Sequence, residues 1–154
     1  MLPVYGQPAF PAPHYLWSPG YWAWSPNYGD YYWVPGTWVL APRPGYFWTP
    51  RYGGWGNGGV YVFHTGYWGT QVGFYGGVNY GFGFGGIGFA GGEWRGGAFA
   101  YNTAVVNVNT TVIHNTYINK TVINNMIIIN NTHTSFNGGP NGIAAQPTPQ
   151  QHAW

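Results

Sequence analysis

The sequence predicts an all-β protein, and three observations lead to this expectation. Ten Trp, fourteen Tyr and nine Phe make up 21% of the 154 residues, a content that disordered segments do not reach. The aromatic residues alternate with 27 Gly and 13 Pro, which interrupt helices. No stretch shows apolar residues at the i, i+3, i+4 spacing of an amphipathic helix. We therefore expect short strands joined by frequent turns.

Charge is nearly absent, with four Lys or Arg and two Asp or Glu, for a formal net charge of +2. Four basic residues are too few for the multiple phosphate contacts that drive nucleic-acid binding. A surface with so little charge favours association with itself, with another protein or with a cell-envelope component. Since the chain has no cysteine, disulfides and thiolate metal sites are excluded.

A repeat follows a proline-rich lead-in at residues 1–13 and occupies residues 14–70. Its four copies, with the fourth weaker than the others, begin at tyrosines spaced by 16, 15 and 15 residues. The motif residues are Tyr15, Trp17, Gly20, Trp22, Tyr31, Trp33, Gly36, Trp38, Tyr46, Trp48, Gly66 and Trp68. In the third copy Arg51 replaces the glycine and Gly53 replaces the second Trp, whose role we expect Trp55 to take.

Each repeat is predicted to form a small hairpin. Pro19-Gly20 and Pro35-Gly36 suit the centre of a type II turn, which places glycine at positive φ. Segments 26–30 and 42–45 would then link one hairpin to the next as an antiparallel meander. The aromatic side chains can be core and cross-strand residues, or they can form a binding surface.

Residues 71–136 are predicted to continue the β structure, first in a glycine-rich segment and then in an Asn-rich tract. Aromatic residues and glycine alternate strictly over 80–85, which is the period of a strand, and 91–97 fits a second strand bounded by turns. The Asn-rich tract after them contains two copies ten residues apart, and it is typical of solenoid rungs, of a cross-β segment or of an exposed hairpin or arm. Its expected assembly residues are Val112, Ile113, Asn115, Val122, Ile123 and Asn125, and we expect the tract to pair either with the protein's own sheet or with a second copy. Residues 137–154 are rich in Gly, Pro and Gln, which predicts a disordered tail.

No catalytic constellation is recognisable. Asp30 and Glu93 are the only two carboxylate side chains and are far apart in sequence, and no serine lies in a nucleophile elbow. The five histidines lack ligand spacing, so a copper or zinc site would require His114 and His133 to meet on neighbouring rungs. We expect a protein that is not an enzyme, with no catalytic residue, metal or cofactor.

The repeat residues resemble the bacterial YXWGXW (WXXGXW) repeat family, and segments 73–81 and 101–107 resemble the segments located after the repeats in its members. The resemblance implies export through a signal peptide, and the family has no established activity that would assign catalytic residues. Residues Met1-Leu2-Pro3-Val4 do not form a leader, so we expect a mature region.

Three functions are consistent with these observations. The first is a structural or self-assembling protein of the cell envelope or extracellular space, forming a homo-oligomer or fibre or binding an envelope component. The second is a glycan-binding module that uses exposed Trp and Tyr. The third is a β-protein associated with the outer membrane, although its strands are short for that role. The expected location is the periplasm, the outer-membrane surface or the extracellular space.

Overall fold

The computed structural model describes residues 2–3, 7–8, 13–108, 110, 113–120, 134–147 and 149. Over 13–108, 113–120 and 134–147 the chain forms short strands and one 3-10 turn, η1 (Asn57–Gly59), without an α-helix. The all-β prediction is confirmed at this level. Within the described part of the chain, no helical segment has the length and hydropathy to span a membrane.

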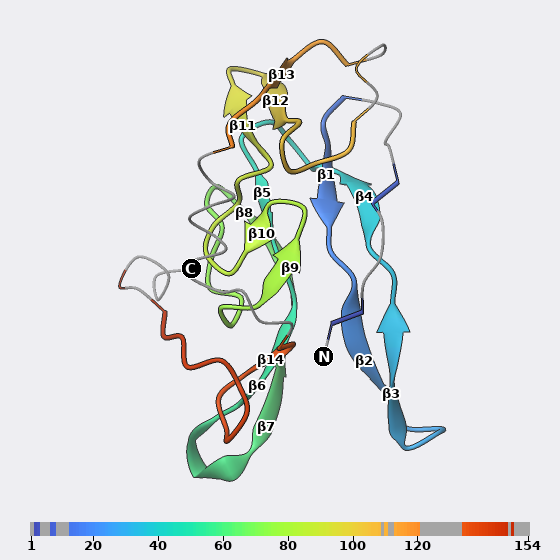
Figure 1. Ribbon diagram of the computed structural model, residues 1–154, viewed down its shortest axis with the longest axis vertical. Helices are drawn as coiled ribbons and strands as arrows, with labels where there is room; N and C mark the ends of the chain where they lie inside the picture. The colour runs from blue at the N-terminus through green and yellow to red at the C-terminus, as the bar shows by residue number, and fades with distance from the viewer. Residues whose placement is uncertain are drawn as a thin grey trace.

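The first four strands form one long, interrupted hairpin, here called the N-terminal hairpin (Figure 1). They are β1 (Tyr15–Ser18), β2 (Tyr21–Ser25), β3 (Asp30–Val34) and β4 (Thr37–Leu40). β1 pairs with β4 and β2 pairs with β3, both antiparallel and in one continuous register. The chain reverses at residues 26–29, where Gly29 has a φ of 63° and its N–H donates to the carbonyl of Ser25.

This arrangement corrects the prediction that each Pro-Gly pair forms a hairpin tip. Gly20 and Gly36 do not have the positive φ that a type II turn requires. Both pairs instead lie between the two ladders of the hairpin, opposite each other. Proline lacks an N–H and therefore interrupts a ladder of hydrogen bonds without reversing the chain. The repeats consequently pair with one another across one hairpin, and the predicted meander of separate hairpins is not formed.

Strands β5 to β8 form a second hairpin of the same design, which we call the central hairpin. They are β5 (Phe47–Thr49), β6 (Tyr52–Trp55), β7 (Tyr61–His64) and β8 (Tyr67–Gly69). β5 pairs with β8 and β6 pairs with β7, again in one register across a two-residue interruption. Residues 42–45 form the predicted turn between the hairpins, with Gly45 at a φ of 89°.

The glycine-rich segment forms a tight hairpin, which corrects the expectation of one strand over 80–85. β9 (Asn79–Gly81) pairs with β10 (Phe84–Gly85). Phe82 and Gly83 connect them with φ values of 53° and 105°. Positive φ at both central residues is the mark of a type I′ turn, whose twist suits a two-residue hairpin. The strict alternation of aromatic residues and glycine is the pattern of a single strand, so it did not predict a turn at this point.

Three further strands form a sheet of their own: β11 (Gly92–Arg95), β12 (Ala98–Asn102) and β13 (Thr116–Tyr117). The first, as predicted over 91–97, pairs antiparallel with β12, and the turn between them has Gly96 at a φ of 64°. β13 pairs with β12 in parallel. The described part of the Asn-rich tract thus adds a short edge strand to this sheet, and the described residues form no solenoid.

Strand β14 (Phe136–Asn137) pairs in parallel with β6, so residues 137–147 differ from the disordered tail that their composition predicted. The side-chain amide of Asn137 donates to the carbonyls of Gly76 and Ala145, at 2.9 and 3.0 Å. Ile143 packs against a buried cluster. Backbone pairing with β6, one side-chain amide and one aliphatic side chain therefore hold a segment that is rich in Gly and Pro.

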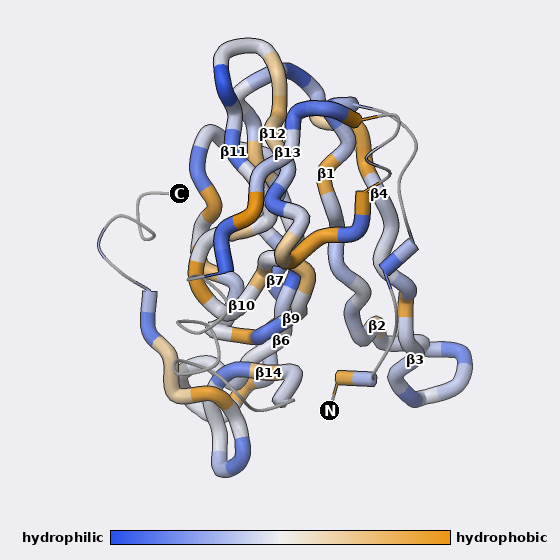
Figure 2. The backbone as a smooth tube through the Cα atoms, turned by 45° about the horizontal axis from the view of Figure 1, so that its top comes forward, coloured by the Kyte–Doolittle hydropathy of each residue, from blue (hydrophilic) through white to orange (hydrophobic). Residues whose placement is uncertain are grey.

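Two buried clusters connect these small sheets. One contains Leu16, Ala41, Phe99, Tyr101, Val106 and Ile113, and the other contains Leu2, Trp17, Tyr75, Val78, Tyr80 and Phe84. Figure 2 shows that apolar residues occur in short stretches along the coloured part of the chain, separated by neutral and polar ones. Aromatic rings from several distant segments therefore provide much of the buried volume.

Candidate functional site

The repeat motif builds two reciprocal contacts across the N-terminal hairpin. Trp17 and Trp38 face each other with ring centroids 5.3 Å apart and planes at 66°. The indole of Trp17 also covers Gly36, where an added β-carbon would lie 2.4 Å from ring carbon Cζ2. Trp22 and Trp33 repeat the edge-to-face contact at 5.4 Å and 67°. The Trp33 ring in turn covers Gly20 at 2.3 Å.

These contacts give the W-x-x-G-x-W spacing a physical meaning. In an antiparallel pair, the residue opposite and the residue two positions along lie on one face and touch the same side chain. The first Trp of each copy therefore meets the second Trp of the other copy directly and its glycine diagonally. Glycine is needed because any β-carbon would displace the ring. Two copies related by an approximate twofold axis thus form one structural unit.

The central hairpin preserves one half of this unit. Trp48 and Trp68 are 5.3 Å apart at 58°, and Trp48 covers Gly66 at 2.4 Å. In the other half, Arg51 takes the place of the covered glycine. Its guanidinium carbon lies 4.7 Å from the ring centre of Tyr21 and 5.2 Å from that of Trp48, so the charge rests on aromatic faces from both hairpins.

Trp55 does not replace the missing second Trp of the third copy, contrary to our expectation. It lies opposite Tyr61, with ring centroids 5.2 Å apart. The ring of Tyr61 reaches back over Gly53, where a β-carbon would come within 2.9 Å of its Cε1 carbon. The degenerate half of the central hairpin is therefore closed by a tyrosine.

The leading tyrosines of the repeats do not share one environment. Tyr15 packs against a buried cluster, and its carbonyl accepts a hydrogen bond from the hydroxyl of Tyr101 at 2.7 Å. The ring of Tyr46 lies 5.2 Å from the guanidinium of Arg43. Tyr31 is exposed and contacts Trp24 at 5.0 Å. The structure therefore gathers the Trp and Gly residues of the motif but distributes its tyrosines.

An open groove of about 1160 Å³ lies between the distal halves of the two hairpins, β2–β3 and β6–β7. In Figure 1 both pairs of strands lie in the lower half of the molecule, β6–β7 to the left and β2–β3 to the right, and each pair ends in its own turn. Tyr21 and Phe63 approach across the groove with ring centroids 6.1 Å apart. The lining comprises Leu2, Tyr21, Trp22, Ala23, Trp24, Asp30, Tyr31, Tyr52, Gly53, Trp55, Tyr61, Phe63, Tyr80, Ser135 and Phe136.

Aromatic pairs form the two walls of this groove. Trp24 and Tyr31 stand at 70° to each other on one wall, and Trp55 and Tyr61 stand at 76° on the other. All four side chains are substantially exposed. Partial burial raises the pKa of the Tyr61 phenol, and the Tyr31 phenol raises that pKa further, so the two hydroxyls lie close enough to interact. The carboxylate of Asp30 accepts a hydrogen bond from the N–H of Tyr31 at 2.7 Å.

Sequence reasoning did not identify this groove. Trp24, Trp55 and Phe63 lie outside the repeat motif, and they converge only because the two hairpins stand side by side. These strand pairs are about 30 residues apart in sequence, and the spacing of residues within one repeat does not predict that they meet. The one available signal was the unusually aromatic tip of each hairpin.

The predicted assembly residues fall into different places. Ile113 packs in a buried cluster with 4% of its surface exposed, and the carbonyl of Asn115 accepts a hydrogen bond from the N–H of Tyr101 at 2.8 Å. The remaining four, Val112, Val122, Ile123 and Asn125, lie outside the described residues. Ile113 and Asn115 therefore connect this tract to the protein's own sheet.

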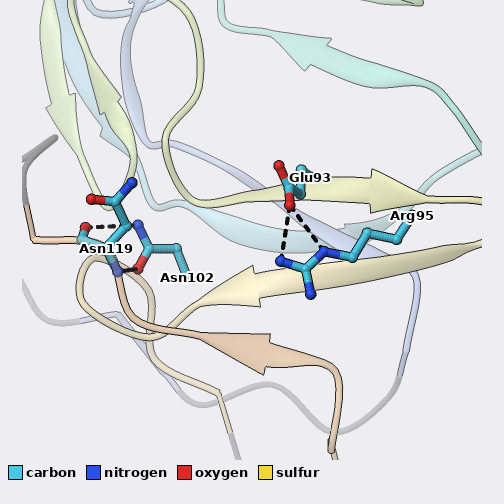
Figure 3. A network of polar contacts seen from close by, with 4 residues as sticks. All are labelled: Glu93, Arg95, Asn102 and Asn119. Atoms are coloured by element: carbon cyan, nitrogen blue, oxygen red, sulfur yellow. Dashed lines mark hydrogen bonds and ion pairs between the residues drawn. The ribbon is translucent and has the colours of Figure 1, made fainter.

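Asn102 is the polar centre of the connection (Figure 3). Its side-chain amide donates to the carbonyl of Asn119 at 3.1 Å and accepts from the Asn119 N–H at 3.0 Å. The same amide donates to the carbonyl of Ala90 at 3.0 Å. Nearby, Glu93 and Arg95 form an exposed ion pair at 2.9 Å. Both features fit a structural role, because buried amides need partners and exposed ion pairs contribute little.

No group of three or more His, Asp or Glu side chains suited to a metal ion occurs among the residues that the structure describes. His114 is exposed, and His133, its suggested partner, lies outside that part of the chain. The groove is therefore the feature of the described surface that best fits a binding role.

Comparison with curated proteins and with solved structures gave no match for this chain. Comparison with protein families gave a match over residues 13–39, the segment that contains β1, β2 and β3 and nearly all of β4. The matching description is the WXXGXW repeat, in two copies, and these are the two copies that pair across the N-terminal hairpin. The expected resemblance is confirmed there, and the chain carries a pair of WXXGXW repeats.

Proposed function

We propose that this protein is a non-enzymatic structural protein that self-assembles in the cell envelope or outside the cell. Its low charge, its aromatic repeats and its β architecture support the proposal. Export and an envelope location belong to the same proposal, and they rest on the likeness to a repeat family whose members are typically exported. The observation that carries self-assembly is the exposed edge of the central hairpin.

Strand β7 forms that edge. In the three-stranded sheet it lies outermost, next to β6, and all four of its residues are exposed. The strand reads Tyr-Val-Phe-His and contains no Lys, Asp, Glu or Pro. Native edge strands commonly use such residues to prevent pairing with another chain. β7 lacks this protection.

The hydrogen-bond pattern identifies the peptide groups available for pairing. The N–H of Gly56 donates to the carbonyl of Val60 at 2.7 Å, so these two residues form a hydrogen-bonded pair next to the turn. Bonded and non-bonded pairs alternate along an antiparallel ladder. The N–H and C=O groups of Tyr61 and Phe63 therefore point away from β6. A strand of a second copy can form hydrogen bonds with them.

A lysine on the edge strand tests the proposal. Val62 is exposed and has the opposite side-chain direction to Tyr61 and Phe63, so Val62→Lys adds charge to the edge while leaving the groove residues in place. Ile87→Lys makes a similar change at an exposed loop position and serves as the control. Light scattering coupled to size exclusion should show an oligomer for the parent and for Ile87→Lys, and a shift toward monomer for Val62→Lys.

A parent chain that remains monomeric at high concentration would contradict assembly altogether. If Val62→Lys leaves the oligomer unchanged, the contact between copies does not involve β7. The Asn-rich residues Val112, Val122, Ile123 and Asn125 stay predicted assembly residues in that case. Paired lysine substitutions at Val122 and Ile123 would then be the next test.

A further inference from the structure

We infer that the groove between the two hairpins binds an uncharged glycan chain. This inference goes beyond the proposed self-assembly, since it concerns a different surface and a different partner. It rests on the aromatic walls, on the polar groups between them, and on the charge and size of the groove.

The walls offer ring faces at several positions along the groove. Trp24 with Tyr31 and Trp55 with Tyr61 form edge-to-face pairs, and each pair is held by cross-strand pairing within its hairpin. The flat side of a sugar ring presents C–H groups of slight positive charge, which suit the negative face of an aromatic ring. Because the two rings of each pair already contact each other, their arrangement lowers the ordering cost of binding.

Polar groups lie among these rings, as sugar hydroxyls require. The lining includes the Asp30 carboxylate, the phenol groups of Tyr31 and Tyr61 and the hydroxyl of Ser135. A carboxylate has several acceptor positions, and the Tyr31 N–H uses one of them on Asp30. The Tyr61 phenol, like other phenols, is protonated in the physiological range and can donate a hydrogen bond, and partial burial raises its pKa further.

Charge and size narrow the class of ligand. The described lining contains no Lys or Arg, so it offers no partner to phosphate, sulfate or carboxylate groups. Arg51 is close by, but its guanidinium lies against the rings of Tyr21 and Trp48. The volume of about 1160 Å³ exceeds the roughly 300–1,000 Å³ typical of sites for single small molecules. A neutral oligosaccharide fits both observations.

Neighbouring tyrosines on β3 provide a matched pair of variants. Tyr31 lines the groove with 45% of its surface exposed, whereas Tyr32 is 52% exposed and does not line it. The full chain should be titrated with hexamers of β-1,4-linked glucose and of β-1,4-linked N-acetylglucosamine, followed by calorimetry and Trp fluorescence. At least one hexamer should bind, Tyr31→Ala should weaken it about tenfold or more, and Tyr32→Ala should change it less than about twofold.

Failure to bind either hexamer at millimolar concentration would overturn the inference. Equal losses in Tyr31→Ala and Tyr32→Ala would also overturn it, provided that circular dichroism shows both variants folded. If Tyr31→Ala instead lowers the molecular mass of an oligomer and neither hexamer binds, the groove holds a second copy and the glycan inference is wrong. The edge variant Val62→Lys distinguishes this result from failure of the proposed assembly through β7.

Discussion

The indole of Trp17 covers Gly36 from the opposite strand, so that a β-carbon at Gly36 would lie 2.4 Å from its Cζ2 atom. Trp33 covers Gly20 in the same way. Each repeat thus supplies a ring to the other repeat and a bare backbone position to receive a ring. The stability of the hairpin depends on both.

Replacing the covered glycine with alanine should destabilise the fold. Gly36→Ala forces the Trp17 ring away from a buried position, and overpacking of this kind costs about 1–3 kcal/mol. Gly97→Ala is the control, because a β-carbon there meets no described atom within 4 Å and φ is not positive. Urea denaturation of both variants measures the difference. Equal denaturation midpoints would show that the Trp17 ring moves to accommodate the added β-carbon without a loss of stability.

The two tryptophans of a cross-strand pair should be energetically coupled. A double-mutant cycle on Trp22 and Trp33 with alanine should give a coupling free energy of about 0.5–1.5 kcal/mol, as for other edge-to-face pairs. Trp94, whose indole N–H donates to the carbonyl of Tyr46, belongs to another part of the fold. A cycle on Trp22 and Trp94 should therefore give a value near zero. Absence of coupling between Trp22 and Trp33 would contradict the paired-repeat unit.

Stability should fall at alkaline pH because of Tyr75. Its phenol is fully buried, donates to the carbonyl of Gly88 and accepts from the N–H of Gly86, and burial raises its pKa well above the usual value near 10. Above that usual value the unfolded state releases the proton first, so the unfolded state binds fewer protons. The free energy of unfolding should then decrease by about 1.4 kcal/mol per pH unit for this group.

The variant Tyr75→Phe should be less stable at neutral pH but should lose stability less steeply above pH 10. Phe84→Leu changes the same buried cluster without altering an ionisable group, and it should keep the slope of the parent protein. Thermal unfolding across pH 8–11 compares the slopes. The assignment to Tyr75 fails if Tyr75→Phe and the parent have the same slope.

The C-terminal segment should depend on one amide. Asn137→Ala removes hydrogen bonds to the carbonyls of Gly76 and Ala145, each worth about 1 kcal/mol net. Residues 134–147 should consequently show faster hydrogen exchange in the variant, while the N-terminal hairpin stays protected. Asn141→Ala, at an exposed position of the same segment, should leave exchange unchanged. Similar exchange in both variants would mean that backbone pairing with β6 and the packing of Ile143 hold the segment without the Asn137 amide.

Local chemistry in the sequence was sufficient to predict the β class, chain reversals at 26–30 and 42–45, and a strand within 91–97. The first reversal is the tip of the N-terminal hairpin, however, and not the predicted link between two hairpins. Local chemistry did not distinguish a Pro-Gly turn from a Pro-Gly interruption, because both accept the same residues. The choice is made by Trp17 and Trp33, whose rings need the glycines of the opposite strand. Residues such as Phe82, at positive φ, could not be predicted, because phenylalanine rarely adopts that conformation.

The groove was not predicted from the sequence either, because it also depends on contacts between distant segments. Its walls come from hairpins whose mutual placement depends on contacts such as Arg51 over Tyr21, and no local pattern specifies such a contact. The Asn-rich tract shows the opposite case. Its local pattern predicted pairing with the protein's own sheet or with a second copy, and Ile113 and Asn115 follow the first alternative, because strand β12 lies beside them.

The reciprocal cover of Gly20 and Gly36 also sets a rule for how such chains can lengthen. A single added repeat would bring one uncovered glycine and two unmatched indoles, and it would have no antiparallel counterpart. Duplication of two repeats together would add a closed module with its own register. Growth in even numbers is thus favoured. In the copy that contains Arg51, rings from both hairpins cover the guanidinium that stands in the place of the glycine.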